Sequence, residues 1–352
     1  MEHLIPGEWF AGLPQWLLLA LSAGAIAVLV KGADWLVDGA SGLAFRLGVS
    51  QVIIGATVVS LGTTSPECAV SVMAAWSGRP GLALGNAIGS VVADTGLIFG
   101  LGCLLAVLPA DRYILARQGW VQFGAAALLT LLCYGAYGAM GAKAVLGRPV
   151  GLLLLVLLAA YLYASVRWSR NHPGGPWVPG GGRDIAAGTA RAPAVRLLAL
   201  LLFGLALVVL ASRALILAVT ELAENHWHVP EVVIAATLVA LGTSLPEMVI
   251  GLTSIVKGHR DLLVGNIIGA DILNVLFVVG ASAVAAPLPI LEASSEVPRI
   301  VLLVHLPAML AILGLFRVFI HRAARRGHFR RWQGLPLVAI YVAYVVVQYL
   351  VT

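Results

Sequence analysis

The sequence contains little charge for its length. Asp, Glu, Lys and Arg make up 11% of its 352 residues, whereas soluble globular chains carry about 25%. Hydrophobic residues make up 60%, above the usual value of about 45–50%. This composition excludes a soluble enzyme and indicates a protein embedded in a lipid bilayer.

Cysteine is also scarce, and common catalytic motifs are absent. Cys68, Cys103 and Cys133 are widely spaced within apolar segments, so neither a disulfide framework nor a CxxC metal site is expected. No HExxH pattern or nucleophile–base pair occurs in an apolar segment, so we expect neither enzymatic activity nor a cofactor. The net charge of +6 lies in loops without a basic, aromatic-rich face, which argues against nucleic acid as a partner.

Long apolar runs dominate the rest of the chain. A transmembrane helix needs about 20 mostly apolar residues, and ten runs of that kind predict an all-α membrane protein with ten transmembrane helices. The ten runs cover residues 16–44, 52–76, 82–108, 118–137, 150–168, 195–222, 232–256, 262–286, 300–320 and 335–351.

The polar stretch 169–194 divides the chain into two predicted five-helix halves, 1–168 and 195–352. It is rich in Gly and Pro, which is typical of a linker. If loops alternate between the two sides of the membrane, sixteen Lys and Arg residues fall on the side of this linker and four on the other. Because cytoplasmic loops carry the positive excess, the linker is expected in the cytoplasm and both termini on the far side of a cell (inner) membrane.

An internal repeat relates the two halves. GATVVSLGTTSPE at 55–67 aligns without gaps to AATLVALGTSLPE at 235–247, with eight of thirteen positions identical and an offset of 180. The same offset places GNAIGSVVAD at 85–94 over GNIIGADILN at 265–274. Five helices separate equivalent segments, so the second copy must enter the membrane in the opposite orientation. This pattern predicts an inverted-topology repeat with a substrate site near the midplane.

Six acids fall inside the predicted helices, where each costs at least about 2.5–3.5 kcal/mol at the helix centre. They are Asp34, Asp38, Glu67, Asp94, Glu247 and Asp271. Gly and Pro in both copies of the first motif predict broken helices at the midplane. Each proline frees the carbonyl four residues earlier, at Gly62 and Gly242, to face an ion.

Repeat-related positions gather four polar side chains into one predicted site. Glu67, Asp94, Glu247 and Asn274 supply three carboxylates and one amide. Their charge of up to −3 can be balanced by one Ca²⁺ with a proton, or by three monovalent cations. Oxygen ligands of this kind suit hard cations such as Ca²⁺ and Na⁺.

The paired GTTSPE and GTSLPE motifs, followed by GNAIGS and GNIIGA, resemble the α-repeats of the Na⁺/Ca²⁺ exchanger family in the cation/Ca²⁺ exchanger superfamily, prokaryotic ten-helix type. The resemblance covers essentially the whole chain. It implies an antiporter that exchanges Ca²⁺ for Na⁺ by alternating access, with the first and sixth helices sliding as a gating pair.

The same resemblance implies roles for individual residues. Glu67 and Glu247 match carboxylates that take Ca²⁺ directly, and Asn86 and Asn266 match residues that hold the backbone together. The remaining ligands implied by the resemblance are the hydroxyls and carbonyls of Thr63, Thr64, Thr243 and Ser244, the carbonyls of Ser60 and Ala240, and the Na⁺-site hydroxyl of Ser90.

Several positions depart from the pattern. Asp94 is the acid and Asn274 the amide, the reverse of many prokaryotic members, and Ala270 replaces an expected Ser. Asp271 replaces an expected Asn and adds a fourth acid, which makes it a possible additional ligand or proton site. A proton-coupled Ca²⁺ antiporter therefore stays an alternative, and a passive cation channel is a further one.

Asp34 and Asp38 lie one turn apart on the first predicted helix. Lys31 is three residues before Asp34, so an ion pair within this helix is expected. We interpret these acids as structural or gating groups, with ion ligation as the alternative.

Overall fold

The computed structural model describes residues 6–47, 50–76, 80–171, 192–226, 244–291 and 300–351. The α-helices of this part are α1 (Gln15–Leu47), α2 (Gln51–Ile54), α3 (Ser60–Trp76), α4 (Pro80–Ala93), α5 (Gly100–Leu105), α6 (Arg112–Met140), α7 (Arg148–Asn171), α9 (Ala194–Glu221), α12 (Leu245–Val256), α13 (Arg260–Leu273), α14 (Gly280–Ala285), α15 (Leu306–Arg326) and α16 (Gly334–Val351). π-Helical turns occur at η2 (Gly55–Val59), η3 (Asp94–Phe99), η5 (Leu222–His226), η7 (Asn274–Val279) and η8 (Val301–His305). Short 3₁₀ turns occur at η1 (Gly7–Trp9), η4 (Gly141–Lys143) and η9 (Arg331–Gln333).

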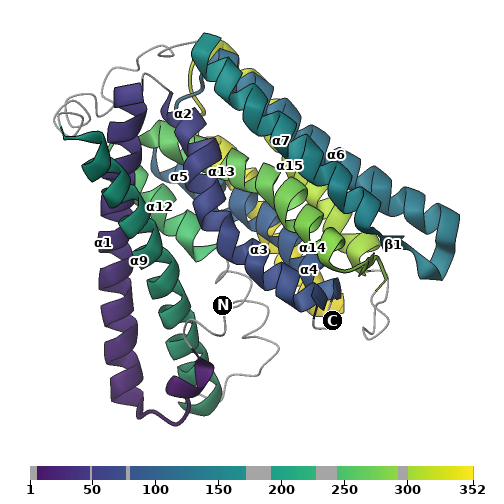
Figure 1. Ribbon diagram of the computed structural model, residues 1–352, viewed down its shortest axis with the longest axis horizontal. Coiled ribbons are helices and arrows are strands. Elements are labelled where there is room, and N and C mark those ends of the chain that lie inside the picture. The colour runs from purple at the N-terminus through teal and green to yellow at the C-terminus, as the bar shows by residue number, and fades with distance from the viewer. Residues whose placement is uncertain are drawn as a thin grey trace.

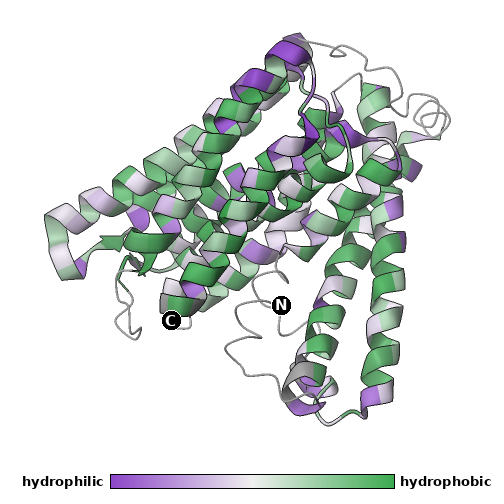
Figure 2. Ribbon diagram, turned by 180° about the vertical axis from the view of Figure 1, so that it is seen from behind, coloured by the Kyte–Doolittle hydropathy of each residue, from purple (hydrophilic) through white to green (hydrophobic). Residues whose placement is uncertain are grey.

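Within the described residues, eight helices are long and apolar enough to cross a membrane. They correspond to eight of the ten predicted spans, and Figure 2 shows their hydrophobic character along most of their length. The seventh predicted span is represented by the 12-residue α12, and the rest of that span lies outside the described residues. The tenth corresponds to the 18-residue α16.

The helices form two groups of different burial. α1 and α9 run side by side at one edge of the molecule (Figure 1), and a Cβ on Gly204 would lie 2.6 Å from the carbonyl oxygen of Gly32. Their backbones therefore meet directly, and about a third or less of each apolar span is buried (33% and 28%). The span that contains α13 is 94% buried, so α13 lies at the centre of the remaining helices.

Two short backbone pairings lock the ends of the central helices. The two-residue strands β1 (Val145–Leu146) and β2 (Leu288–Pro289) pair antiparallel. Pro109 forms the same kind of bridge with His328. Pro109 and Pro289 are 180 residues apart, so both copies of the repeat end their third helix in an equivalent backbone pairing with the other half of the chain.

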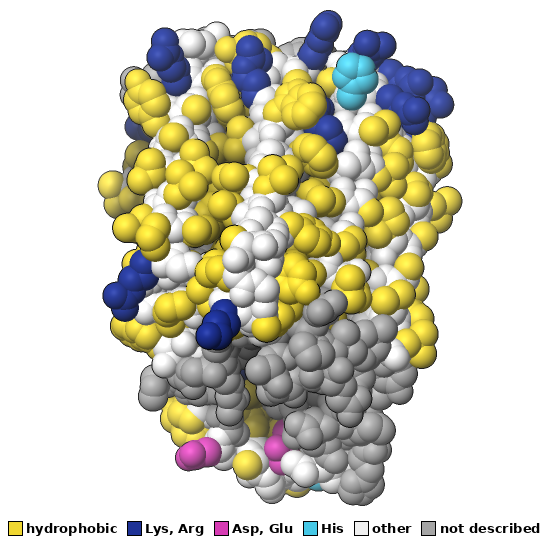
Figure 3. Space-filling model, turned by 90° about the vertical axis from the view of Figure 1, so that its right-hand side faces the viewer, with side chains coloured by type: hydrophobic (Ala, Val, Ile, Leu, Met, Phe, Trp, Pro, Cys, Tyr) yellow, Lys and Arg dark blue, Asp and Glu magenta, His cyan; other side chains and the backbone are white. Residues whose placement is uncertain are grey.

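The charged side chains are separated along the molecule. Figure 3 shows Lys and Arg gathered mainly at one end of the visible face, Asp and Glu at the other end, and hydrophobic side chains between them. A broad apolar surface with charge at both ends is the surface expected of a helical protein in a bilayer.

Candidate cation site

The first motif lies on a helix that continues through its proline. The π-helical turn η2 precedes α3, and α3 includes Pro66 in its interior. The predicted break at Gly62 and Pro66 is therefore wrong for this copy. Proline in a helix costs about 3 kcal/mol, which packing of the surrounding helices must offset. Pro66 still donates no hydrogen bond to the carbonyl of Gly62, so the predicted loss of one amide donor holds.

Hydroxyl groups line this helix. Thr63 Oγ1 donates to the carbonyl of Ser60 at 3.2 Å, and Ser60 Oγ lies 3.5 Å from the carbonyl of Thr57. Thr64 is also buried, and its hydroxyl has no hydrogen-bond partner among the described residues. The motif thus contains one buried hydroxyl without a hydrogen-bond partner among the described residues, that of Thr64. The hydroxyls of Ser60 and Thr63 lie against backbone carbonyls three residues earlier in the chain.

Glu67 connects the first motif to the second one. Its Oε1 accepts a hydrogen bond of 3.0 Å from Ser90 Oγ on α4, whereas Oε2 is buried and has no partner in the described chain. Asn86, one turn before Ser90, donates to Ser71 Oγ on α3 at 3.1 Å. Asn86 therefore joins α3 to α4, the structural role that the resemblance implies for it, and Glu67 keeps one free oxygen.

The second copy contributes Ser244 and Glu247. Ser244 is the N-cap residue of α12, and Glu247 lies in the first turn of that helix. Both are buried, and neither Ser244 Oγ nor either carboxylate oxygen of Glu247 makes a hydrogen bond of regular geometry with the described residues. Thr63 is nevertheless close enough to interact with Glu247, and Asp94 with Ser244. Ala240 and Thr243, predicted as ligands, lie outside the described residues.

Asp94 and Asn274 occupy equivalent places in the two copies. Each is the first residue of a π-helical turn, η3 or η7, and each is fully buried. None of the four polar side-chain atoms of this pair makes a hydrogen bond of regular geometry in the described structure, although Asn274 lies close enough to Glu67, and Asp94 close enough to Ser244, to interact with it. π-Turns inside α-helices are frequent at functional sites because they leave backbone groups out of the regular ladder.

Asp271, like Glu67, has one hydrogen-bonded carboxylate oxygen, but two donors share that oxygen. Its Oδ2 accepts hydrogen bonds from Thr95 Oγ1 on η3 and from Gln122 Nε2 on α6, the latter at 2.5 Å. Its Oδ1 is buried and has no partner among the described residues. Asp271 therefore lies at the border between the cluster and α6.

The structure brings the acids into one electrostatic cluster. Glu67 interacts with Glu247 and Asp271, and Asp94 interacts with all three of these acids. In the described residues no Lys, Arg or His forms an ion pair with any of them. An uncompensated buried carboxylate costs several kcal/mol, so the cluster requires protons or cations.

The cluster is an assembly of mixed oxygens and not a dense metal centre. Among the described residues, no three His, Cys, Asp or Glu side chains lie close enough to hold one metal ion by themselves. Hydroxyls, an amide and carbonyls would have to complete the coordination, as is usual for hard cations.

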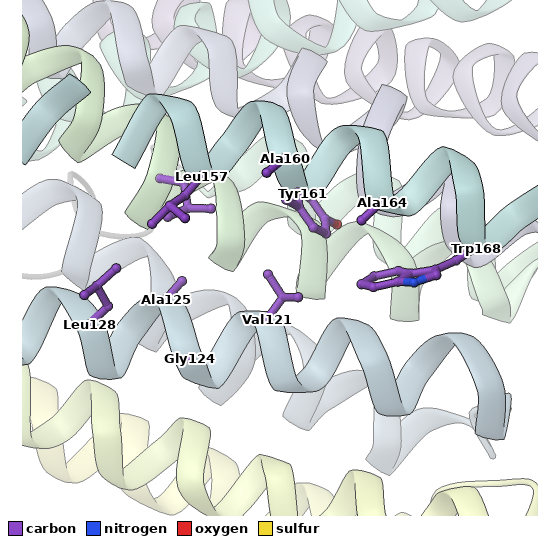
Figure 4. Close-up of a pocket in the computed structure, with 10 residues that line it drawn as sticks. Val121, Gly124, Ala125, Leu128, Leu157, Ala160, Tyr161, Ala164 and Trp168 are labelled. Atoms are coloured by element: carbon purple, nitrogen blue, oxygen red, sulfur yellow. The ribbon is translucent and has the colours of Figure 1, made fainter. Parts of the chain in front are cut away.

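A described cavity lies elsewhere. It measures about 360 Å³, lies between α6 and α7, and has almost entirely apolar walls that include Val121, Tyr161 and Trp168 (Figure 4). Such walls offer no ligands to a cation.

Two features of the site were not predicted from the sequence. Gln122 and Thr95 were not identified as partners of Asp271, although Gln122 is a polar residue in an otherwise apolar span and could have been noticed for that reason. The π-turns that begin at Asp94 and Asn274 have no recognised sequence signal, but their 180-residue offset follows the repeat.

These observations define a mostly helical membrane protein with a buried, acidic, oxygen-rich cluster built by two related motifs. The family described as sodium/calcium exchanger protein matches residues 17–167 and 196–350. The chain belongs to this family, which confirms the resemblance inferred from the motifs. The family is one of membrane transporters.

Individual relatives agree with this assignment. The chain is 35% identical to "Putative antiporter CaxA" of Alkalimonas amylolytica over 74% of this chain and 79% of that protein. It is 28% identical to "Sodium/calcium exchanger MaX1" of Methanosarcina acetivorans over 92% and 95%. It is 33% identical to "Inner membrane protein YrbG" of Escherichia coli over 77% and 81%.

Solved structures share the fold. The sodium-calcium exchanger NCX_Mj, soaked with 2.5 mM Na⁺ and 10 mM Sr²⁺, superimposes with a TM-score of 0.75 at 24% identity over 95% of this chain and 99% of that one. The same exchanger soaked with 0.1 mM Sr²⁺ gives a TM-score of 0.75 at 25% identity.

Proposed function

We propose that this protein is a secondary antiporter that exchanges Ca²⁺ for Na⁺ across the membrane by alternating access. The observation that carries the proposal is the buried cluster of Glu67, Asp94 and Glu247, whose free oxygens have no cationic partner in the described chain. A site of this charge is costly when empty and becomes neutral when it is loaded with cations. Binding, neutralisation and occlusion form the whole mechanism, with no covalent step.

Each ligand has a distinct role in this proposal. Glu67 and Glu247 bind Ca²⁺ directly, while Asp94 and Asn274 complete the coordination from the start of the two π-turns. Ser90 orients Glu67 and supplies a hydroxyl to a Na⁺ site. The further ligands in the proposal are Ser60, Thr63, Thr64 and Ser244, with Ala240 and Thr243 outside the described residues.

We further propose an inverted five-plus-five repeat as the basis of alternation. Its halves are 1–168, with ion motifs at 55–94, and 195–352, with ion motifs at 235–274, joined by the linker 169–194. The equivalent backbone pairings at Pro109 and Pro289 and the equivalent π-turns support this division. The separation of Lys and Arg from Asp and Glu in Figure 3 supports a fixed orientation in the membrane, and the proposal places the linker in the cytoplasm and both termini outside it.

Transport assays with conservative variants test the site. Glu67→Gln or Glu247→Gln should reduce Na⁺-dependent ⁴⁵Ca²⁺ uptake into everted membrane vesicles to background, because each variant removes one ligand charge. Glu8→Gln is the matched control, since Glu8 is exposed in the short turn η1. Uptake by both site variants at the rate of the control would contradict the assignment.

Asp271 supports a second candidate function, proton-coupled Ca²⁺ exchange. Its Oδ2 is held by Thr95 and Gln122, and its buried Oδ1 has no partner in the described structure, so this acid requires a proton or a cation of its own. Proteoliposomes without Na⁺ and with an imposed pH gradient separate the two candidates. Ca²⁺ flux that follows the pH gradient, and is lost in Asp271→Asn, would favour proton coupling.

A further inference from the structure

Lys257 joins the α1–α9 pair to the central helices. It lies in the turn between α12 and α13, and its Nζ is 2.6 Å from Asp38 Oδ1 and 3.4 Å from Asp34 Oδ1. The same ammonium group donates to the backbone carbonyl of Asp34 at 2.9 Å. Both acids are on α1, so one lysine of the turn makes three polar contacts with that helix.

The expected ion pair within α1 is present, and Lys257 adds a second and closer partner. Lys31 does approach Asp34, but at 3.7 Å and with 58% of its side chain exposed. Lys257 makes the shorter contacts and is 20% exposed. Because exposed ion pairs are worth little and partly buried ones more, Lys257 is the principal partner of these acids.

Backbone hydrogen bonds fix the shape of the turn that carries Lys257. Lys257 N donates to Thr253 O at 2.9 Å, and His259 N donates to Ser254 O at 2.8 Å. Gly258 has φ +79°, a conformation that suits glycine and closes the turn. The ring of His259 is 3.1 Å from the side-chain amide of Gln51, which ties the turn to α2 as well.

His259 does not compete with Lys257 for Asp38 near neutral pH. Burial lowers the pKa of His259 below its ordinary value, and the nearby charges of Asp38 and Lys257 act on this pKa in opposite directions. The ring is therefore neutral at pH 7, and the positive charge beside Asp38 is that of Lys257.

An apolar contact also joins the α1–α9 pair to the first ion motif. A Cβ on Gly62, inside the first motif, would lie 2.4 Å from Leu205 Cδ2 of α9, so this leucine packs directly on the motif helix. The pair therefore contacts the helix that carries the first ion motif. Apolar side chains without directional bonds can slide past one another, whereas the ion pairs of Lys257 hold only at one position of α1.

We propose that Lys257, Asp34 and Asp38 form a latch that fixes the α1–α9 pair against the central helices. This latch must open each time the pair moves and exposes the cation site to the side of the membrane on which the latch lies. The need for such a movement rests on the proposed antiport. The latch itself is a property of the described contacts.

Distance measurements test the latch independently of transport. Spin labels can be attached to Phe45→Cys, near the C-terminal end of α1, and to Leu105→Cys, the last residue of α5. Both side chains are exposed, and the distance between the two labels reports the position of α1. The three native cysteines are buried, which confines labelling to the introduced ones. We expect Lys257→Ala to change the ratio of the latched to the unlatched population in the distance distribution about tenfold. Lys257→Arg should retain the original distribution.

Two further variants complete this experiment. Asp38→Asn removes the 2.6 Å contact from the other side and should cause the same shift, so a fold defect of one variant alone cannot imitate the result. Lys31→Ala removes the long, exposed pair and should leave the distances unchanged. Unchanged distances in both Lys257→Ala and Asp38→Asn would overturn the proposal.

Cross-linking tests whether the latch must open during exchange. In Asp38→Cys/Lys257→Cys, a short bifunctional methanethiosulfonate should stop ⁴⁵Ca²⁺ exchange, and a reducing agent should restore it. Undiminished exchange in the cross-linked protein would refute the latch. If the parent protein exchanges neither ion, the proposed antiport fails, and the spin-label distances alone decide on the latch.

Discussion

Exchanging the charge between Asp94 and Asn274 tests the equivalence of the two repeat copies. Both residues are fully buried, both begin a π-turn, and none of their polar side-chain atoms makes a hydrogen bond of regular geometry in the described structure. Asp and Asn are nearly isosteric, so Asp94→Asn, Asn274→Asp and the double variant change the location of one charge and little of the packing. The number of negative charges in the cluster falls by one in the first variant, rises by one in the second and is unchanged in the double variant.

The magnitude follows from the kind of interaction that is lost. A hydrogen bond or contact to a charged group is worth about 1.5–3 kcal/mol, and each 1.4 kcal/mol is tenfold in an equilibrium constant. Asp94→Asn should therefore raise the KM for Ca²⁺ by about 10- to 100-fold. Asn274→Asp adds an uncompensated buried charge and should slow exchange, because the loaded site no longer becomes neutral. The double variant should recover most of the loss.

Initial rates of ⁴⁵Ca²⁺ uptake, measured in proteoliposomes over a range of Ca²⁺ and internal Na⁺ concentrations, give the KM of each variant. Thermal melting of the purified protein in detergent shows whether each variant is folded. A folded double variant as inactive as the worse single variant would show that the two π-turn positions are not equivalent. An unchanged KM in Asp94→Asn would remove this residue from the site.

Three further changes have outcomes set by single contacts. Ser90→Ala removes the 3.0 Å hydrogen bond to Glu67 and should raise the Na⁺ concentration for half-maximal exchange by about 3- to 10-fold, a loss of about 1 kcal/mol that uptake assays can measure. Gly204→Ala places a Cβ 2.5 Å from Leu36 N and should lower the melting temperature, whereas Gly24→Ala, where a Cβ meets nothing within 4 Å, should not lower it. Gln122→Leu leaves Asp271 with one hydrogen-bond donor fewer and should change the pH dependence of Ca²⁺ flux without abolishing the flux. An unchanged pH dependence would show that Asp271 takes no part in transport.

The sequence predicted the helices and the cluster because both depend on strong physical constraints. Backbone groups in a bilayer must be paired within the chain, so spanning segments appear as apolar runs of the correct length. Acids in such runs are costly, so Glu67, Asp94 and Glu247 stood out, and they lie together in the structure. These predictions needed no knowledge of side-chain packing.

Features that depend on tertiary packing could not be predicted. Pro66 predicts a break by its local preference, yet α3 continues through it because surrounding helices support the motif. Lys257 falls in the predicted loop between the spans 232–256 and 262–286, where it is one of the sixteen positive charges counted on the linker side. Its contact with Asp38 joins residues more than 200 positions apart. Sequence spacing instead favoured Lys31, three residues from Asp34, which makes the weaker contact.

The partners of Asp271 break the symmetry of the repeat. At an offset of 180, Asp271 corresponds to Val91 and Thr95 corresponds to Val275, and both valines are buried. The hydrogen bond between Thr95 and Asp271 therefore has no polar equivalent at the repeat-related positions, where both side chains are valine. Two access states built from identical copies would be equal in energy, whereas one additional buried acid with its donors makes them unequal. We therefore expect Asp271 to bias the resting orientation of the proposed exchanger, and Asp271→Asn should reduce that bias in the spin-label distances of α1.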